Sequence, residues 1–166
     1  MALLVVATAA RAIAEEAPSR LDQLMAGYVL NFTKFVEWPE SLHNSEIVIC
    51  VAGNPGLYDA LRAGATGTSV GPHHVTARRI DSETSAAGCH VLYIEQASAL
   101  HVAAPESMLT VSDGGGFAHG GGTIELFTQQ NRLRFIINLD NARRAGLRIS
   151  SNLLQLAASV EGGEPR

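Results

Sequence analysis

The sequence has little positive charge and few of the residues on which whole classes of function depend. A single lysine, Lys34, accompanies eleven arginines; acidic residues (16) outnumber basic ones (12), and the formal net charge is −4. No basic run is longer than two residues. Proteins that bind nucleic acid need clustered Lys and Arg to neutralise phosphates, so this composition argues against a nucleic-acid partner.

Long hydrophobic runs are also missing, and no stretch predicts a membrane-spanning helix. The first residues are typical of a secretory signal: an apolar core over 3–7 is followed by a small-x-small cleavage site, Ala12-Ile13-Ala14. We therefore expect residues 1–14 to be a signal peptide that is truncated at its front, because no positive segment precedes the apolar core. The alternative is an ordinary apolar N-terminal helix. Residues 15–166 are expected to form a single domain, since 46% hydrophobic residues suffice for one core.

Cysteine is scarce, with only Cys50 and Cys89 present. Each lies in a stretch that predicts a buried strand. An even number of cysteines usually pairs in an oxidising compartment, so an exported chain is expected to join these two in a disulfide. Two free thiols in the core are the alternative. A metal site is not expected, because neither cysteine has a ligand at close spacing, and the Cys-x-x-Cys redox motif is absent.

Known catalytic motifs are missing as well. The six histidines include no His-Glu-x-x-His motif, and no Gly-x-Ser-x-Gly elbow occurs. The glycine-rich stretch 114–122 lacks the terminal Lys of a phosphate-binding loop, and the sixth position of a dinucleotide loop is His119 instead of glycine. We expect no catalytic residue, metal or cofactor, and we expect the glycines to allow a sharp reversal of the chain.

What the sequence does contain is a series of apolar segments that predicts an α/β fold, with a mainly parallel central sheet flanked by helices. A first helix is expected to be capped by Ser19 and Asp22 and to end before Pro39, with a continuous apolar stripe that packs on the sheet. The remaining expected elements are strands at 46–53, 74–80, 89–94 and 108–111, and helices at 55–63 and 98–104.

The C-terminal part adds an antiparallel hairpin at one edge of the sheet. Segments 123–127 and 133–138 are rich in β-branched and aromatic residues, and the polar tetrapeptide 129–132 separates them. A helix is expected to begin at 139–141, where Asp or Asn can cap it, and a second helix is expected over 150–160.

Polar residues follow three of the predicted strands. Asn54, Glu95 and Asp113 should meet at the carboxyl edge of a parallel sheet, where ligands tend to bind. With Phe117 of the glycine loop, Asn54 and Asp113 are the candidate ligand-binding residues. Asp113 is also expected to bond amide groups of its own loop in an Asx-type turn. A rival hypothesis is a hydrolase that uses Ser112, Asp113 and His119.

Several motifs together resemble the YfiR family. The first is YVLNFTKFVEWP over 28–39, and the two cysteine-containing strands are also similar. Others follow in the C-terminal half: Ser112-Asp113, Gly116-Phe117, Gly121-Gly122, Asn138-Leu139-Asp140 and AGLRISS over 145–151. The resemblance covers most of the chain beyond the expected signal. Some family members carry a second disulfide near the hairpin, which two cysteines cannot supply here.

The resemblance implies a periplasmic protein that is not an enzyme. YfiR-like proteins are repressors, and the best-studied member holds the membrane diguanylate cyclase YfiN inactive by binding its periplasmic part. An outer-membrane lipoprotein, YfiB, relieves that inhibition. A role in cyclic-di-GMP signalling and biofilm formation, with a YfiN-like and a YfiB-like partner, is therefore expected. A homodimer is a further alternative, and a periplasmic small-ligand sensor is the rival function.

A partner surface is expected around Arg143, Arg144 and Arg148, because arginine is enriched among the residues that anchor protein interfaces. The alternative is that these arginines only favour a helix C-terminus and solvent.

Overall fold

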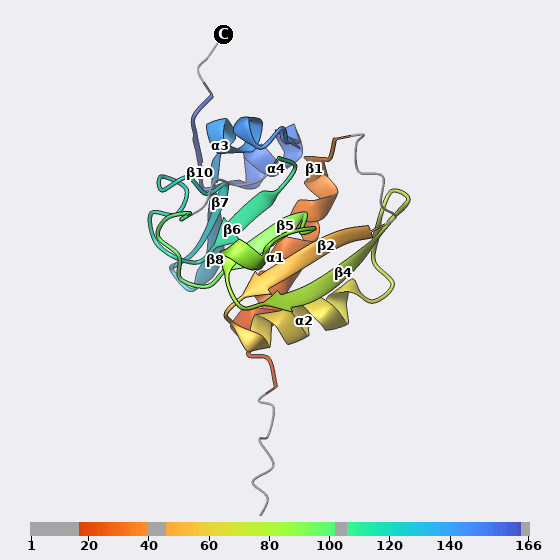
Figure 1. The fold of residues 1–166 in the computed structure, drawn as a ribbon. Coiled ribbons are helices and arrows are strands. Elements are labelled where there is room, and N and C mark those ends of the chain that lie inside the picture. Colours follow the sequence, from red (N-terminus) through yellow and green to blue (C-terminus); the bar gives the residue numbers. More distant parts are fainter. Residues whose placement is uncertain (1–16, 40–45, 102–105, 164–166) are drawn as a thin grey trace, which may run out of the picture.

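A computed structural model describes residues 17–39, 46–101 and 106–163. The expected signal peptide, 1–14, lies outside these residues. The expected α/β fold is confirmed: a central sheet of eight strands, mostly parallel, carries helices on one face (Figure 1). From one edge to the other, the strand order is β10-β8-β7-β6-β5-β2-β4-β3.

The strands of the central sheet include the four expected parallel strands and the hairpin. Strands β2, β4, β5, β6 and β7 run parallel, whereas β8 is antiparallel to β7, and β3 is antiparallel to β4. In chain order they are β2 (Glu46–Ala52), β3 (Ser69–Val70), β4 (His73–Ile80), β5 (Val91–Ile94), β6 (Leu109–Ser112), β7 (Ile124–Gln129), β8 (Arg132–Asn138) and β10 (Ser159–Glu161). A separate antiparallel pair joins β1 (Val36–Glu37) to β9 (Arg148–Ile149).

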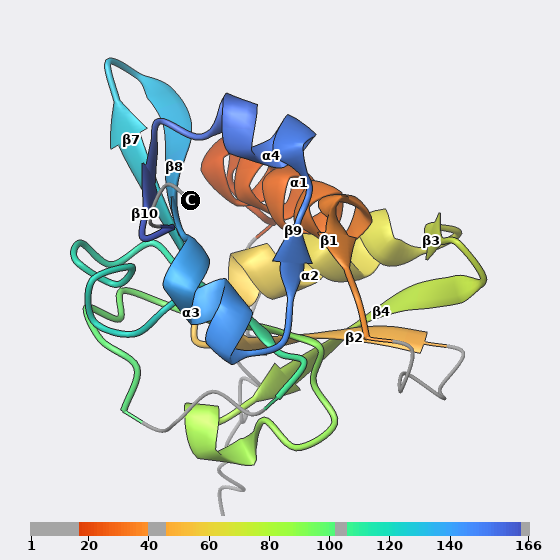
Figure 2. The ribbon, with the colours of Figure 1, turned by 90° about the horizontal axis from the view of Figure 1, so that it is seen from above.

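Four helices accompany the sheet. They are α1 (Arg20–Phe35), α2 (Pro55–Ala65), α3 (Leu139–Arg144) and α4 (Ser151–Leu156). Helices α1 and α2 cover one face of the sheet, and α4 lies over α1 (Figure 2). The capping prediction is confirmed: the Asp22 amide donates to Ser19 Oγ at 3.1 Å, and the Ser19 amide donates to Asp22 Oδ2 at 2.9 Å.

The apolar stripe of α1 is only partly buried. Met25, Val29 and Phe32 are at most 2% exposed and pack against the sheet. Leu21 and Leu24, which belong to the same stripe, remain 49% and 47% exposed. The first turns of α1 therefore leave apolar surface uncovered.

The helix expected over 98–104 is wrong, and the helix expected over 150–160 is confirmed only in its first part. Residues 98–101 of the helix expected over 98–104 are not helical, and 102–105 lie outside the described residues. This segment runs against the glycine loop instead, with the Leu100 amide donating to the Gly120 carbonyl at 3.1 Å.

The helix expected over 150–160 ends at Leu156, and β10 follows it. The reason is the open edge of the hairpin: the Ala158 amide donates to the Phe135 carbonyl at 2.8 Å, and β10 then pairs parallel with β8. An extended tail satisfies backbone groups of β8 that further helix would leave unpaired. The hairpin therefore lies next to the edge strand of the sheet.

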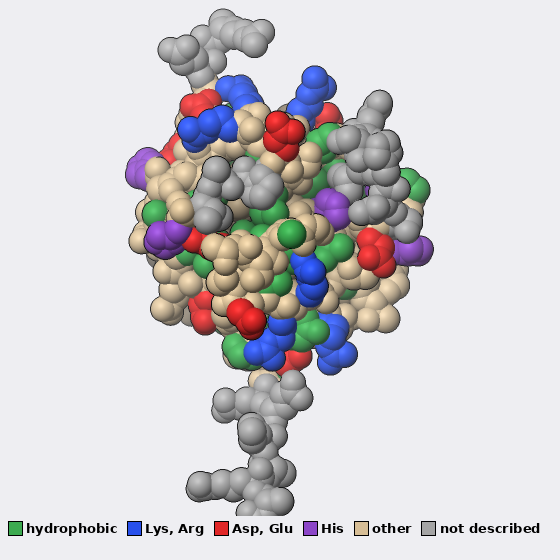
Figure 3. All heavy atoms as spheres, viewed as in Figure 1, with side chains coloured by type: hydrophobic (Ala, Val, Ile, Leu, Met, Phe, Trp, Pro, Cys, Tyr) green, Lys and Arg blue, Asp and Glu red, His purple; other side chains and the backbone are tan. Residues whose placement is uncertain are grey.

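Alternate residues of each strand face two unequal cores. In β2, Ile47, Ile49 and Val51 join the large core under α1 and α2, whereas Val48 and Cys50 face the other side. That second face is covered by loops and by the short 3-10 turn Glu83–Ser85. In the space-filling view of this face, acidic and basic side chains are interspersed and apolar side chains show between the loops (Figure 3).

Candidate functional site

The carboxyl ends of β2, β5 and β6 bring together the residues expected there. The Asn54 amide donates to Glu95 Oε2 at 2.9 Å, and the Gln96 amide donates to Asp113 Oδ1 at 2.7 Å. Asn54 adopts a left-handed conformation (φ 31°) and caps α2, because its Oδ1 accepts from the Leu57 amide at 2.8 Å. The ends of the three strands are thus tied side by side, as the parallel arrangement predicts.

The Asx-type turn expected at Asp113 is wrong. It is Ser112 that organises this loop: its Oγ accepts from the Gly114 and Ala97 amides, each at 3.0 Å, and donates to the Ala97 carbonyl at 3.1 Å. Ser112 is fully buried, so its hydroxyl lies among these loop amides, whereas Asp113 is half-buried. Asp113 is left to bond the amide of the neighbouring loop.

The geometry does not assemble Ser112, Asp113 and His119 into a hydrolytic group. The hydroxyl proton of Ser112 goes to a backbone carbonyl, whereas a nucleophilic serine hands its proton to a base. His119 Nδ1 lies 2.7 Å from Glu161 Oε2 of β10, and the His119 side chain is 78% exposed. In the described part of the chain, no group of three or more His, Cys, Asp or Glu residues is placed to hold a metal ion.

Tyr93 lies beneath this polar edge. Its side chain is fully buried, and its hydroxyl has the side chains of Asp113 and Asn54 as polar neighbours. Burial, followed by the charge of the nearby Asp113, raises the pKa of the Tyr93 hydroxyl, so it stays protonated. The edge therefore contains a buried hydrogen-bond donor close to Asp113 and Asn54.

Asp22, at the start of α1, belongs to the same region. Burial alone would raise the pKa of its carboxyl, but hydrogen bonds from the Ser19 side chain and backbone and from the Asn54 side chain outweigh burial and hold that pKa below its usual value. Asp22 therefore remains charged and adds to the acidic character of the edge.

Phe117 lies apart from solvent. Its ring is fully buried and packs directly against Gly122, where a Cβ atom would collide with it. Phe117 thus anchors the glycine loop to the sheet. Its assignment as a ligand-binding residue stays a prediction, and it would require the loop to open.

Buried polar side chains that the sequence analysis missed hold the glycine loop. Asn138 and Asn141 donate from their Nδ2 atoms to the Ala118 carbonyl, each at 3.0 Å, and Asn141 also donates to the Gly122 carbonyl. The Ala118 amide donates to Glu125 Oε2 at 3.2 Å, and Glu125 is 8% exposed. The sequence feature that could have identified Glu125 is the presence of a carboxylate in the middle of an otherwise apolar strand segment.

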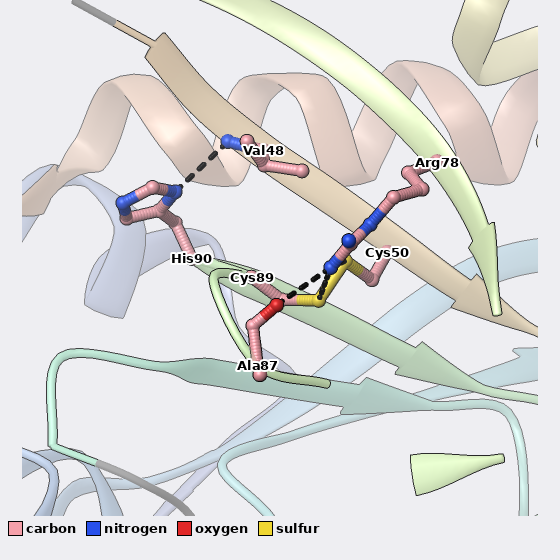
Figure 4. The surroundings of a disulfide bond; sticks show 6 residues. All are labelled: Val48, Cys50, Arg78, Ala87, Cys89 and His90. Atoms are coloured by element: carbon pink, nitrogen blue, oxygen red, sulfur yellow. Dashed lines mark hydrogen bonds between the residues drawn. A yellow bond between two sulfur atoms is a disulfide. The ribbon is translucent and has the colours of Figure 1, made fainter. Parts of the chain in front are cut away.

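The predicted disulfide between Cys50 and Cys89 is present, with a Cα–Cα distance of 5.7 Å (Figure 4). The Arg78 guanidinium lies over it. Arg78 Nη2 donates to the Ala87 carbonyl at 2.7 Å and lies 3.2 Å from Cys89 Sγ. The bond joins β2 to the segment just before β5 and fixes the loop that covers this face.

The three candidate arginines, Arg143, Arg144 and Arg148, are all exposed, on α3 and β9. Arg143 Nη1 is 3.4 Å from Asp140 Oδ1, and Arg148 Nη1 is 3.9 Å from Glu37 Oε2. These are surface pairs of small energetic value. The geometry neither gathers the arginines around a cavity nor assigns them a partner, so their role stays a prediction.

A groove of mixed polar and apolar lining, which the sequence analysis did not locate, lies between α1, α4 and the start of β8. It has a volume of about 400 Å³ and is lined by Leu24, Tyr28, Asn131, Arg132, Leu133, Arg134, Phe135 and Leu156. The signal that could have found it was the extent of the apolar stripe of α1, which is wider than the sheet can cover.

In the described part of the chain, no helix is both long enough and apolar enough to cross a membrane.

Comparison with known families gives one match, to YfiR/HmsC-like proteins over residues 22–158. The matched region begins within α1, ends just before β10, and contains the disulfide, the glycine loop and the hairpin. This family is regulatory and not catalytic, and it supports a role in cyclic-di-GMP signalling from the periplasm. Since the match covers well over half of the sequence, the chain belongs to the YfiR/HmsC-like family.

Proposed function

We propose that the protein is a periplasmic negative regulator that binds a membrane diguanylate cyclase and holds it inactive, which limits cyclic-di-GMP and biofilm formation. The observation that carries this proposal is the family match over residues 22–158. The partner is the periplasmic part of a YfiN-like cyclase, and a YfiB-like outer-membrane lipoprotein would relieve the inhibition.

The chemistry of the chain supports a binding role. A disulfide suits an oxidising compartment such as the periplasm. The polar residues that might have served catalysis are used inside the fold: Ser112 and Asn141 satisfy backbone groups of loops, and Glu125 accepts a loop amide. A regulator needs only a stable surface with which to contact its partner.

The test is to measure intracellular cyclic-di-GMP in the host with the gene present, deleted, and restored. We expect the level to rise on deletion and to fall again on complementation. In the same strains, the tagged protein should capture the periplasmic domain of a membrane diguanylate cyclase. An unchanged cyclic-di-GMP level under several growth conditions, with no cyclase captured, would overturn the proposal.

A small-ligand sensor is the second candidate, and the observation that favours it is the cluster of polar side chains at the carboxyl edge, where the buried Tyr93 hydroxyl lies beside Asp113 and Asn54. A thermal-shift screen of amino acids and vitamins tests it. If the protein is such a sensor, one compound should raise the melting temperature of the wild type and leave that of Tyr93→Phe unchanged. Equal stabilisation of both proteins would place the ligand elsewhere.

A further inference from the structure

Among the described residues, large apolar side chains are exposed at only four positions: Leu21 and Leu24 of α1, Leu156 of α4, and Val160 of β10. Leu156 is the most exposed, at 67%. Two of the four, Leu24 and Leu156, line the groove between α1, α4 and β8. Leaving both in water is unfavourable, so a contact that covers them would stabilise a complex.

The floor of the groove is a packed aromatic cluster. The rings of Tyr28 and Phe135 lie edge to face with centroids 5.9 Å apart, and Phe32 lies 5.1 Å from Phe135 on the inner side. Tyr28 Oη donates to the Leu133 carbonyl at 3.1 Å, which ties α1 to β8. The groove is therefore preformed, and a partner would not need to order it.

One wall of the groove is an open strand edge. Strand β10 pairs with β8 only from Ile136 to Asn138, so no strand of the described chain continues along the outer edge of Arg132–Phe135. The two-residue turn makes Gln129 and Arg132 a hydrogen-bonded pair, and the alternation of an antiparallel ladder then turns the backbone groups of Leu133 and Phe135 outward. The carbonyls of both residues do point outward: the Leu133 carbonyl accepts from Tyr28 Oη, and the Phe135 carbonyl accepts from the Ala158 amide.

The charge of the groove is opposite to that of the whole chain. Among its lining residues the only charged ones are Arg132 and Arg134, and both are exposed. The chain as a whole carries a formal net charge of −4. A groove that combines exposed leucines with two arginines, in a protein of negative net charge, favours a partner segment that combines apolar side chains with a carboxylate.

We propose that this groove is the surface that holds the inhibited protein partner. An extended segment of the partner lies beside Arg132–Phe135 as an added strand, with an apolar side chain between Leu24 and Leu156 and a carboxylate against Arg132 or Arg134. The Leu133 and Phe135 carbonyls already accept from Tyr28 Oη and the Ala158 amide, so the added strand bonds this edge through its own carbonyls, which accept from the Leu133 and Phe135 amides, and the groove supplies side-chain specificity. The inference rests on the proposed function, and it assigns the contact to a surface other than the ligand-binding residues of the carboxyl edge and other than the arginines of α3 and β9.

The chain offers a matched control for the apolar contact. Leu24→Asp and Leu156→Asp each place a carboxylate in the groove, whereas Leu21→Asp changes a leucine of nearly equal exposure on the same helix, outside the groove. We expect both groove variants to capture the periplasmic domain of the cyclase at least about tenfold more weakly, as hot-spot truncations do, and to leave cyclic-di-GMP at the level of the deletion strain. Leu21→Asp should behave as the wild type.

The charged rim has its own control. Arg132→Glu combined with Arg134→Glu should weaken capture more at low salt than at high salt, because it exchanges attraction for repulsion. Arg144→Glu, on the rival surface of α3, should leave capture unchanged. Circular dichroism and thermal melting of every variant verify that loss of capture is not loss of folding.

The outcomes separate this inference from the function on which it rests. Capture by the wild type and equally by the groove variants would overturn the inference alone. Failure of the wild type to capture any cyclase or to lower cyclic-di-GMP would overturn both. A wild-type dimer that Leu24→Asp converts to monomer with capture intact would identify the groove as a contact between two copies of this chain, which also overturns the inference.

Discussion

The two faces of the central sheet are covered in different ways. On one face, α1 and α2 pack apolar side chains such as Val29, Phe32 and Leu61 against the strands, and burial of apolar surface is the main source of the attachment. On the other face, the apolar core consists of five buried residues, Cys50, Ala86, Cys89, Leu92 and Met108, beneath loops. A helix satisfies its own backbone hydrogen bonds, whereas a loop does not, so a loop cover needs other attachments.

Three kinds of attachment replace helix packing on the loop face. The disulfide ties the 81–90 loop to β2. Buried polar side chains bond loop amides and carbonyls, as Ser112 and Asn141 do. Close backbone contacts at glycines bring the loops together, as at Gly114, where a Cβ would collide with the Ala97 carbonyl. The face without helices is therefore stabilised by few, specific links, and each link can be removed separately.

The largest expected effect lies on the helix face. Phe32→Ala removes a ring that is 1% exposed and contacts both Tyr28 and Phe135. We expect the free energy of unfolding to fall by about 3–5 kcal/mol, from lost burial and the cavity left behind. Denaturant unfolding measures it, with exposed Leu21→Ala on the same helix as control, expected to change stability by about 0.5 kcal/mol or less. If Phe32→Ala lowers the free energy of unfolding no more than Leu21→Ala does, apolar burial is not what stabilises the helix face.

The next effect is on the loop face. Replacing both disulfide cysteines, as Cys50→Ala with Cys89→Ala, should lower the free energy of unfolding by about 2–4 kcal/mol, because the bond closes a chain segment of 39 residues in the unfolded state. Urea unfolding of the variant and of the reduced wild type should agree. If oxidised wild type and variant unfold at the same urea concentration, the loop face does not depend on its covalent link.

A smaller effect is expected at the glycine loop. Gly114→Ala forces a methyl group against the Ala97 carbonyl, whereas Gly115→Ala meets nothing within 4 Å. We expect Gly114→Ala to cost about 1–3 kcal/mol, as overpacking does, and Gly115→Ala to be close to neutral. The difference in melting temperature between the two adjacent variants is the measurement. Equal melting temperatures would show that the 96–99 segment moves away freely and is no part of the loop cover.

The helix face could be predicted from the sequence, and much of the loop face could not. The apolar spacing of α1, its Ser19 cap and the β-branched hairpin are local patterns, and all three are confirmed. A helix was predicted over 98–104 because the composition suits one. The described part of that segment, 98–101, runs instead against glycines some twenty residues later in the chain, and no local pattern contains those contacts.

The candidate sites show the same division. Asn54, Glu95 and Asp113 were expected to meet because they follow parallel strands, and they do. The groove depends on how α1, α4 and β8 come together, and α4 was predicted to continue through Ala158 and Val160. Because the chain leaves the helix after Leu156 and continues as β10, Leu156 remains exposed, and this follows only from the tertiary structure.

The smallest expected effect concerns His90, at the start of β5 where the two faces meet. Its Nδ1 accepts from the Val48 amide at 2.9 Å, and its ring lies edge to face with Trp38 at 6.2 Å, so the folded protein needs a neutral imidazole (Figure 4). Burial, followed by the charge of His73, lowers the pKa of His90 below its usual value of 6.5. The unfolded chain regains the usual value and therefore binds more protons than the folded chain as pH falls.

Stability should consequently be highest above about pH 6.5, decline as the pH drops below that value, and level off once the pH lies below the folded pKa of His90. His90→Gln keeps an acceptor for the Val48 amide but cannot be protonated, so it should remove part of the decline. Urea unfolding of both proteins at pH 7.5 and pH 5 measures the difference, and Trp38, the only tryptophan, reports the local change by fluorescence. The same loss of stability in both proteins would mean that another group responds to acid, and that the hydrogen bond between β5 and β2 tolerates protonation of His90.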